Sequence, residues 1–217
     1  MVDESSESLP VEAQLAVAHS ILEWRPALTI FLELDMRLAR IVAGTSEPML
    51  GQMRLAWWRE QLANTPEHRP AGDAVLDGIG VHWQGCEHAL IALVDGWEFM
   101  LAEGLDEAGA SAFAQGRAAP FVAMGQMAEA SNASSVDAAA QRWALVDAAV
   151  HIPDGTERTM LLDLASANRE AVRLPRSLRG LAVLDALARR SLSRGGRPLM
   201  EGRGASIAAA RAAIFGR

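Results

Sequence analysis

The sequence predicts an all-α protein, and three observations carry this prediction. Alanine is very frequent, runs of β-branched residues are scarce, and apolar residues recur at spacings of three and four. Ile30, Leu34, Leu38 and Ile41, for example, fall on one side of a helix. Half of the 217 residues are apolar, so the chain is able to bury a substantial core. We therefore expect one helical domain over residues 1–217, with residues 1–9 flexible.

Prolines, glycines and polar runs mark where the helices begin and end. Pro26 is expected to end the first helix, because the residue before a proline disfavours the α conformation. Gly44 ends the second helix, and Ser46 with Pro48 opens the third as an N-cap followed by a first-turn proline. The expected helices cover about residues 10–24, 27–42, 46–63, 71–83, 86–103, 107–130, 136–150, 155–171, 176–192 and 203–215.

The composition excludes several classes of chemistry. All 20 basic residues are Arg and Tyr is absent, so a Schiff-base lysine, a pyridoxal anchor, a P-loop lysine and a catalytic phenol are excluded. The single cysteine, Cys86, excludes an internal disulfide and a cysteine-based zinc cluster. The acidic first residues lack the pattern of a signal peptide, and no apolar stretch has the length of a membrane span. The expected location is the cytoplasm, with peripheral contact to a membrane.

Charge is distributed unevenly along the chain. The net charge is −7, yet residues 173–217, here called the basic segment, hold ten Arg and only two acidic residues, Asp185 and Glu201. A segment of this kind indicates a surface that meets lipid headgroups, a diphosphate, nucleic acid or an acidic patch of a protein. The alternative is that the basic segment neutralises the acidic body across an internal interface.

Two groups of side chains have a spacing that resembles a metal site. His82 and Cys86 have helical spacing, but no third ligand has metal spacing with them, so zinc is not expected. Asp73 and Asp77 form a D-x-x-x-D pair, which on a helix places two carboxylates on one face, as magnesium–diphosphate chemistry requires. Such pairs are also common on solvated helix faces, and no second cluster opposes this one.

The segment around Trp57 and Trp58 is the most informative part of the sequence. Adjacent tryptophans on a helix point about 100° apart, so one is expected to pack inward. Arg54 precedes Trp58 by four residues and is expected to reach its ring, with Arg59 nearby. This arrangement suits a grip on a diphosphate or carboxylate, and it also suits a purely structural stack, which the composition favours.

Here the chain resembles a known family. The segment EPMLGQMRLAWWREQL, preceded by FLELDMRLARIVAGTS, resembles a helix pair of squalene/phytoene synthase family proteins. Three later segments agree more weakly and in the same order: LVDGWEFML, FAQGRAAPFVAMGQM and LPRSLRGLAVLDALARRSL. The resemblance implies a helical bundle of the isoprenoid synthase type around a central cavity. Active members condense isoprenyl diphosphates head to head and hold magnesium with two aspartate-rich motifs.

The sequence departs from this family where the metal binds. In register with the first motif, the two aspartates fall at Ala39 and Ala43, with Arg40 between them. The region of the second motif, residues 141–154, offers Asp147 and Asp154 but no D-x-x-x-D pattern. Alanine has no oxygen with which to bind Mg²⁺, so the resemblance implies a retained fold and lost prenyl transfer.

Two functions follow from this comparison. The first is a degenerate squalene/phytoene synthase-like protein that acts as a binding or assembly factor without a cofactor, similar to the family's mitochondrial branch associated with assembly of respiratory complex I. The alternative is an isoprenoid-diphosphate prenyltransferase with a reduced metal site, which would use magnesium, so enzyme activity stays open. The expected ligand is a hydrophobic molecule or an isoprenoid diphosphate. No catalytic residue or metal ligand is assigned, and no nucleic-acid partner is expected. The basic segment is expected to meet a membrane or a protein. The residues expected to bind substrate are Arg40, Arg54, Trp58 and Arg59.

Overall fold

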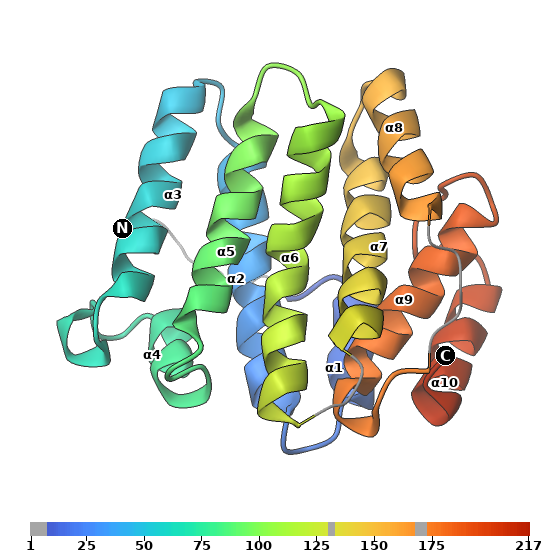
Figure 1. The fold of residues 1–217 in the computed structure, drawn as a ribbon, viewed down its shortest axis with the longest axis horizontal. Coiled ribbons are helices and arrows are strands. Elements are labelled where there is room, and N and C mark those ends of the chain that lie inside the picture. The colour runs from blue at the N-terminus through green and yellow to red at the C-terminus, as the bar shows by residue number, and fades with distance from the viewer. Residues whose placement is uncertain (1–7, 130–132, 168–172) are drawn as a thin grey trace.

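The computed structural model describes residues 8–129, 133–167 and 173–217, and it confirms the all-α prediction (Figure 1). Within these ranges the chain forms ten α-helices and three single-turn 3-10 helices. The α-helices are α1 (Val11–His19), α2 (Arg25–Ala43), α3 (Pro48–Ala63), α4 (Ala74–His82), α5 (Glu87–Glu98), α6 (Glu107–Met127), α7 (Ala133–His151), α8 (Gly155–Ser166), α9 (Arg179–Leu192) and α10 (Gly204–Phe215). The 3-10 helices are η1 (Pro66–His68), η2 (Phe99–Leu101) and η3 (Arg176–Leu178). None of the described helices is long and apolar enough to cross a membrane.

The first predicted helix is wrong at its end. It stops at His19, because Ser20 has an extended backbone and its hydroxyl donates to the Ala16 carbonyl at 3.0 Å. Arg25 then donates to the Ser20 carbonyl and begins α2. Pro26 lies in the first turn of α2, where its missing N–H would have no helical partner in any case. The predicted ends at residues 130 and 171 fall outside the described residues.

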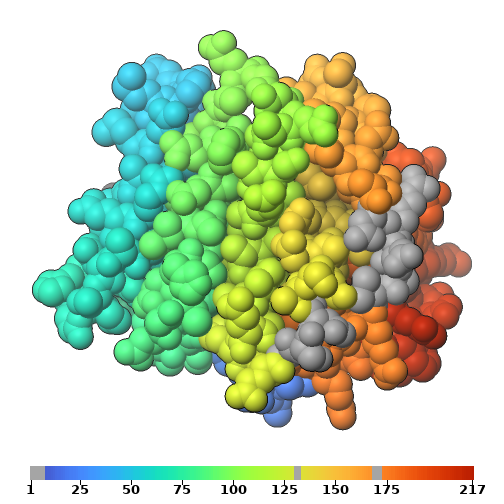
Figure 2. Space-filling model, viewed as in Figure 1, coloured from blue at the N-terminus to red at the C-terminus, as the bar shows by residue number. Residues whose placement is uncertain are grey.

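The helices stand side by side in Figure 1, with α3, α5, α6, α7 and α8 across the front and α1 and α2 behind them. Neighbours in this front row pack on one another, and α9 joins α1, α7 and α10. An aromatic chain links three of the helices through the core. Phe121 of α6 meets Phe31 of α2 and Trp143 of α7 edge to face, at centroid distances of 4.9 and 5.6 Å. Figure 2 shows α3 and the pair α9–α10 at opposite ends of the molecule.

Two glycines set the distance between α5 and α6. A Cβ atom added at Gly116 would lie 2.5 Å from the Ala92 carbonyl oxygen and 2.7 Å from the Cα of Gly96. Since these contacts are with backbone atoms, a side chain at Gly116 would force the two helices apart. The close approach places the next residue of α6, Arg117, beside Trp97 of α5.

Candidate functional site

A cavity of about 410 Å³, here called the central cavity, lies between α1, α2, α6 and α7. Its volume falls in the range of small-molecule sites, about 300 to 1,000 Å³. Most of its wall is apolar, and α2 and α7 contribute the largest share of the lining. The apolar side chains of the wall include Leu32, Met36, Val42, Trp97, Trp143 and Ile152.

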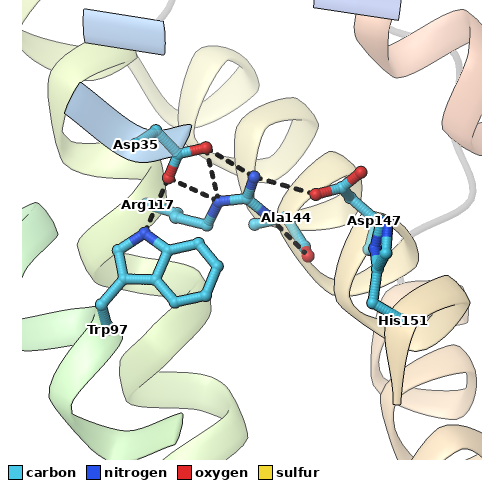
Figure 3. Close-up of polar contacts among 6 residues, drawn as sticks. All are labelled: Asp35, Trp97, Arg117, Ala144, Asp147 and His151. Atoms are coloured by element: carbon cyan, nitrogen blue, oxygen red, sulfur yellow. Dashed lines mark hydrogen bonds and ion pairs between the residues drawn. The ribbon is translucent and has the colours of Figure 1, made fainter. Parts of the chain in front are cut away.

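Arg117 is a buried cation in the wall of the central cavity, with 3% of its surface exposed. Its Nη2 and Nε atoms donate to the carboxylate of Asp35 in α2, at 2.6 and 3.0 Å. The Nη2 atom also lies 2.9 Å from Oδ2 of Asp147 in α7, and Nη1 donates to the Ala144 carbonyl at 3.3 Å. Figure 3 shows the guanidinium held between the two carboxylates. One side chain of α6 therefore connects α2 with α7.

Aromatic rings enclose the same guanidinium. Its central carbon lies 4.2 Å from the ring centroid of Trp143, 5.1 Å from that of Trp97 and 5.5 Å from that of Phe113. The Trp97 indole N–H donates to Oδ1 of Asp35 at 2.7 Å, so this carboxylate is shared between two donors. Burial alone would lower the pKa of Arg117, but the two facing carboxylates raise it above its ordinary value. The guanidinium is therefore a permanent and almost fully buried cation.

The edge of the cavity carries acidic side chains. Glu12 of α1 lines the cavity together with Asp147 and His151 of α7. Burial raises the pKa of Glu12, and the negative charge of Asp147 raises it further. The Nδ1–H of His151 donates to the backbone carbonyl of Asp147 at 2.9 Å. The described lining thus sets three carboxylates against one guanidinium, so the cavity has an acidic character.

The structure places both alanines of the first motif position at the cavity. Ala39 and Ala43 line the wall, as does Asp147 from the predicted second region. Asp154 does not line the central cavity. Its carboxylate accepts hydrogen bonds from the backbone N–H groups of Thr156 and Glu157 and caps α8. In the described residues, no group of three or more His, Cys, Asp or Glu side chains has the arrangement of a metal site.

The four residues expected to bind substrate lie away from the lining of the central cavity. Arg40 is exposed, and Arg54 is exposed on α3. Arg59 forms ion pairs of 2.6 Å with two carboxylates of α5, Asp95 and Glu98. Trp58 is buried, as expected for one of the paired tryptophans, and its neighbour Trp57 is 41% exposed. A role for these four residues in substrate binding stays a prediction.

The cation over the Trp58 ring is Arg37, at 5.7 Å from the centroid. The sequence pointed to Arg54 for this contact. Arg37 also forms a 2.6 Å ion pair with Asp73, whose carboxylate caps α4 by accepting the backbone N–H groups of Val75 and Leu76. Burial raises the pKa of Asp73, but these hydrogen bonds and Arg37 outweigh it and lower the pKa. Asp73 therefore stabilises the start of α4 and its contact with Arg37.

Arg117 and Asp35, the central residues of this site, were not among the residues predicted from the sequence. Arg117 is the one charged residue between Glu107 and Glu129, in a stretch that is otherwise uncharged and mostly small or apolar. Asp35 interrupts the apolar side of residues 27–42 between Leu34 and Leu38. A charged side chain that is buried among apolar residues needs a partner of opposite charge. The isolated charges of Arg117 and Asp35 were therefore the signal that the sequence offered. This signal identifies the two residues as candidates but does not show that they contact each other.

Comparison of the chain with models of known protein families, with curated proteins and with solved structures finds no match. The resemblance to squalene/phytoene synthases therefore stays a prediction from the sequence.

Proposed function

We propose that this chain is a squalene/phytoene synthase-like helical protein without head-to-head prenyl transfer, acting as a binding or assembly factor that holds an apolar ligand in the central cavity. The observation that supports this most is the state of Arg117. Its guanidinium is already bound by Asp35, Asp147 and the Ala144 carbonyl. A diphosphate would have to displace these partners and enter a cavity with an excess of carboxylates.

The polar groups of the cavity favour a ligand with a neutral or cationic head. Asp147 and Glu12 offer acceptor oxygens at the wall, and Glu12 takes up a proton more readily than an ordinary glutamate. The buried indole Nε1 of Trp143, another lining residue, has no hydrogen-bond partner in the described part of the chain. A hydroxyl group is able both to donate to a carboxylate and to accept from an indole N–H. We therefore propose an isoprenoid-like alcohol, rather than a diphosphate, as the ligand class.

The wall at Ala39 and Ala43 supports the same proposal. These positions face the cavity, so carboxylates there would reach a bound diphosphate through magnesium, as the resemblance implies for active members. The methyl groups instead extend the apolar wall. The alternative of a prenyltransferase would have to bind magnesium through Asp147 and Glu12, with Asp35 already shared by Arg117 and Trp97.

Ligand titration followed by tryptophan fluorescence tests the proposal, because Trp97 and Trp143 both line the cavity. Farnesol should change the emission with saturable binding. Farnesyl diphosphate should bind more weakly, and Mg²⁺ should not tighten it. Micromolar binding of the diphosphate that EDTA abolishes would overturn the proposal in favour of the prenyltransferase.

A pair of matched variants locates the binding site. Ala39→Phe fills the central cavity, whereas Ala56→Phe adds the same ring on the exposed side of α3. Farnesol binding should be lost in the first variant and retained in the second. Equal binding by both variants would place the ligand outside the cavity.

A further inference from the structure

Helix α10 carries its large apolar side chains on the outside. Its inner face consists of small residues that are buried, namely Ala205, Ala209 and Ala212. Its outer face presents Ile207, Ile214 and Phe215, which are 64%, 68% and 54% exposed. Ile207 and Ile214 lie two turns apart on one face of the helix, with Phe215 beside them. An isolated exposed apolar residue is ordinary, but three on one short helix form a ridge that water solvates poorly.

Arginines surround this ridge. Arg203 and Arg211 lie one turn before and one turn after Ile207, and both are exposed. Between α9 and α10 lies a second hollow of about 360 Å³, here called the arginine hollow. The hollow is lined by Ala186, Arg189, Arg190, Ala208, Arg211 and Arg217. Four of these six lining residues are arginines, although like charges disfavour close approach.

Little of this positive charge is neutralised by direct contact. Arg189 pairs with Asp185 at 3.0 Å, while Arg194 and Arg197 pair with Glu201. Both carboxylates belong to the basic segment itself. Among the described residues, Arg190, Arg211 and Arg217 form no ion pair, and no arginine of the basic segment pairs with an acidic residue of the preceding body. Direct ion pairs between these arginines and the acidic body are thus not found in the part of the chain that the structure describes.

More cations lie at the end of the same helix. The backbone N–H of Leu174 donates to the carbonyl of Gly216 at 2.8 Å, which brings the start of the basic segment to the end of α10. Arg173 and Arg176 crowd Arg179 there. Burial first, and then these two neighbouring charges, lower the pKa of Arg179. The cations thus extend from the arginine hollow to this end of the surface.

We propose that α10 and the arginine hollow form a docking surface for an anionic lipid membrane. Lipid phosphates would enter the arginine hollow, while Ile207, Ile214 and Phe215 insert among the acyl chains. A membrane surface supplies both an anionic layer and an apolar layer beneath it, which is the order of charges and apolar groups found here. Nucleic acid would satisfy the arginines but would leave the ridge in water. This surface is independent of the central cavity, so the proposal does not rest on the proposed function.

Co-sedimentation of the full chain with vesicles tests this proposal. The protein should pellet with phosphatidylcholine vesicles that contain phosphatidylglycerol, and stay in the supernatant with phosphatidylcholine alone. Raising the salt from about 0.1 M to about 1 M shortens the Debye length from about 10 Å to about 3 Å, so binding should be lost. Binding that ignores lipid charge or salt would overturn the proposal without any variant being made.

Three triple variants then assign the surface. Removal of three unpaired cations should weaken binding on the order of 100-fold, since each contributes about 1 kcal/mol near an anionic surface, or about five-fold. Polar substitution of the ridge should weaken binding at least about ten-fold at unchanged net charge. A matched control at the opposite end of the molecule, on α3, should bind like the wild type. The variants are Arg190→Gln/Arg211→Gln/Arg217→Gln, Ile207→Ser/Ile214→Ser/Phe215→Ser and, as control, Met49→Ser/Met53→Ser/Arg54→Gln.

Circular dichroism and thermal melting of each variant verify that it is folded, as expected for exposed positions. If the α3 control loses as much vesicle binding as the variants of α10 and the arginine hollow, the loss is not specific to the proposed surface and the proposal is refuted. Light scattering of vesicle-free protein provides the remaining outcome. A dimer that the Ile207→Ser/Ile214→Ser/Phe215→Ser variant loses would assign the ridge to a second copy of the chain instead of a lipid surface.

Discussion

Replacement of Arg117 by methionine should be one of the most destabilising substitutions in the chain. Methionine fills a similar volume but removes the charge that Asp35 and Asp147 share. Asp35 is only 5% exposed and would keep the Trp97 indole as its one described donor. Breaking a buried ion pair from one side typically costs about 3 to 5 kcal/mol, because a charge is left without compensation. We expect a loss in this range for Arg117→Met.

The partner substitution, Asp35→Leu, should cost less. Arg117 would keep Asp147 at 2.9 Å and the Ala144 carbonyl at 3.3 Å, so the cation would stay compensated. The Trp97 N–H would lose its acceptor, and the guanidinium would lose its two-atom contact. Because Asp147 continues to compensate the buried cation, we expect a loss of about 2 to 3 kcal/mol, below the cost of a charge left without any partner.

The double variant is the decisive measurement. With both charges absent, no carboxylate at position 35 is left without its cation, although Asp147 still lacks Arg117. The combined loss should therefore be at least about 2 kcal/mol smaller than the sum of the single losses. Urea unfolding followed by circular dichroism and by tryptophan emission gives the three free energies of unfolding, with coincident transitions as the check on two-state behaviour. Single losses that add to within about 0.5 kcal/mol would refute the coupling between Asp35 and Arg117 on which the description of the site depends.

Substitutions at three further positions test separate parts of the structure. Because burial raises the pKa of Glu12, its contribution to stability is present below the unfolded pKa of about 4.3 and is lost as the pH rises through the folded pKa. Glu12→Gln should therefore raise the Tm at pH 7 and leave the Tm unchanged near pH 3.5. An equal change of Tm at both pH values would contradict this prediction. Gly116→Ala should cost about 1 to 3 kcal/mol in urea unfolding, since the new Cβ would meet the backbone at Gly96; a neutral effect would show that the α5–α6 spacing is adjustable. Asp73→Asn keeps a capping side chain but loses the ion pair with Arg37, so Asp73→Ala should lower stability further, by about 1 kcal/mol; equal melting temperatures would remove the assigned role of the cap.

The fold was predictable where the determinants are local. The third helix, for instance, ends at Ala63 as expected, because the polar stretch after it offers no further apolar face. The second helix was predicted from its apolar repeat, and Leu34 and Leu38 are fully buried. The end of α1 was not predictable, since it depends on the hydroxyl of Ser20 bonding to the Ala16 carbonyl and on Arg25 reaching back to the Ser20 carbonyl. The spacing of apolar residues does not predict a hydrogen bond between a side chain and a backbone carbonyl.

The candidate site was less predictable, because its contacts join residues far apart in the sequence. Arg117 contacts Asp35 of α2 and Asp147 of α7. Each of these charged residues, taken alone in the sequence, would be expected on the protein surface. Pattern reasoning instead favoured the compact Trp–Trp–Arg segment. In the structure, Arg59 of that segment binds carboxylates of α5, and Trp58 packs inward. The Trp–Trp–Arg segment thus contributes to helix packing, whereas the isolated charged residues line the central cavity.

The position of Arg117 links the sequence resemblance to the chemistry proposed for the cavity. The resemblance assigns the two metal-binding motifs to residues that lie in α2 and α7, where a metal and its diphosphates would join the two helices. In this chain a guanidinium from α6 joins the same two helices, through Asp35 and Asp147. Arg117 therefore compensates part of the charge of these two carboxylates, and its contacts connect α2 with α7. An anionic head would disturb this balance, whereas an apolar ligand with a hydroxyl head would leave it intact, and this difference is what the farnesol and farnesyl diphosphate titrations measure.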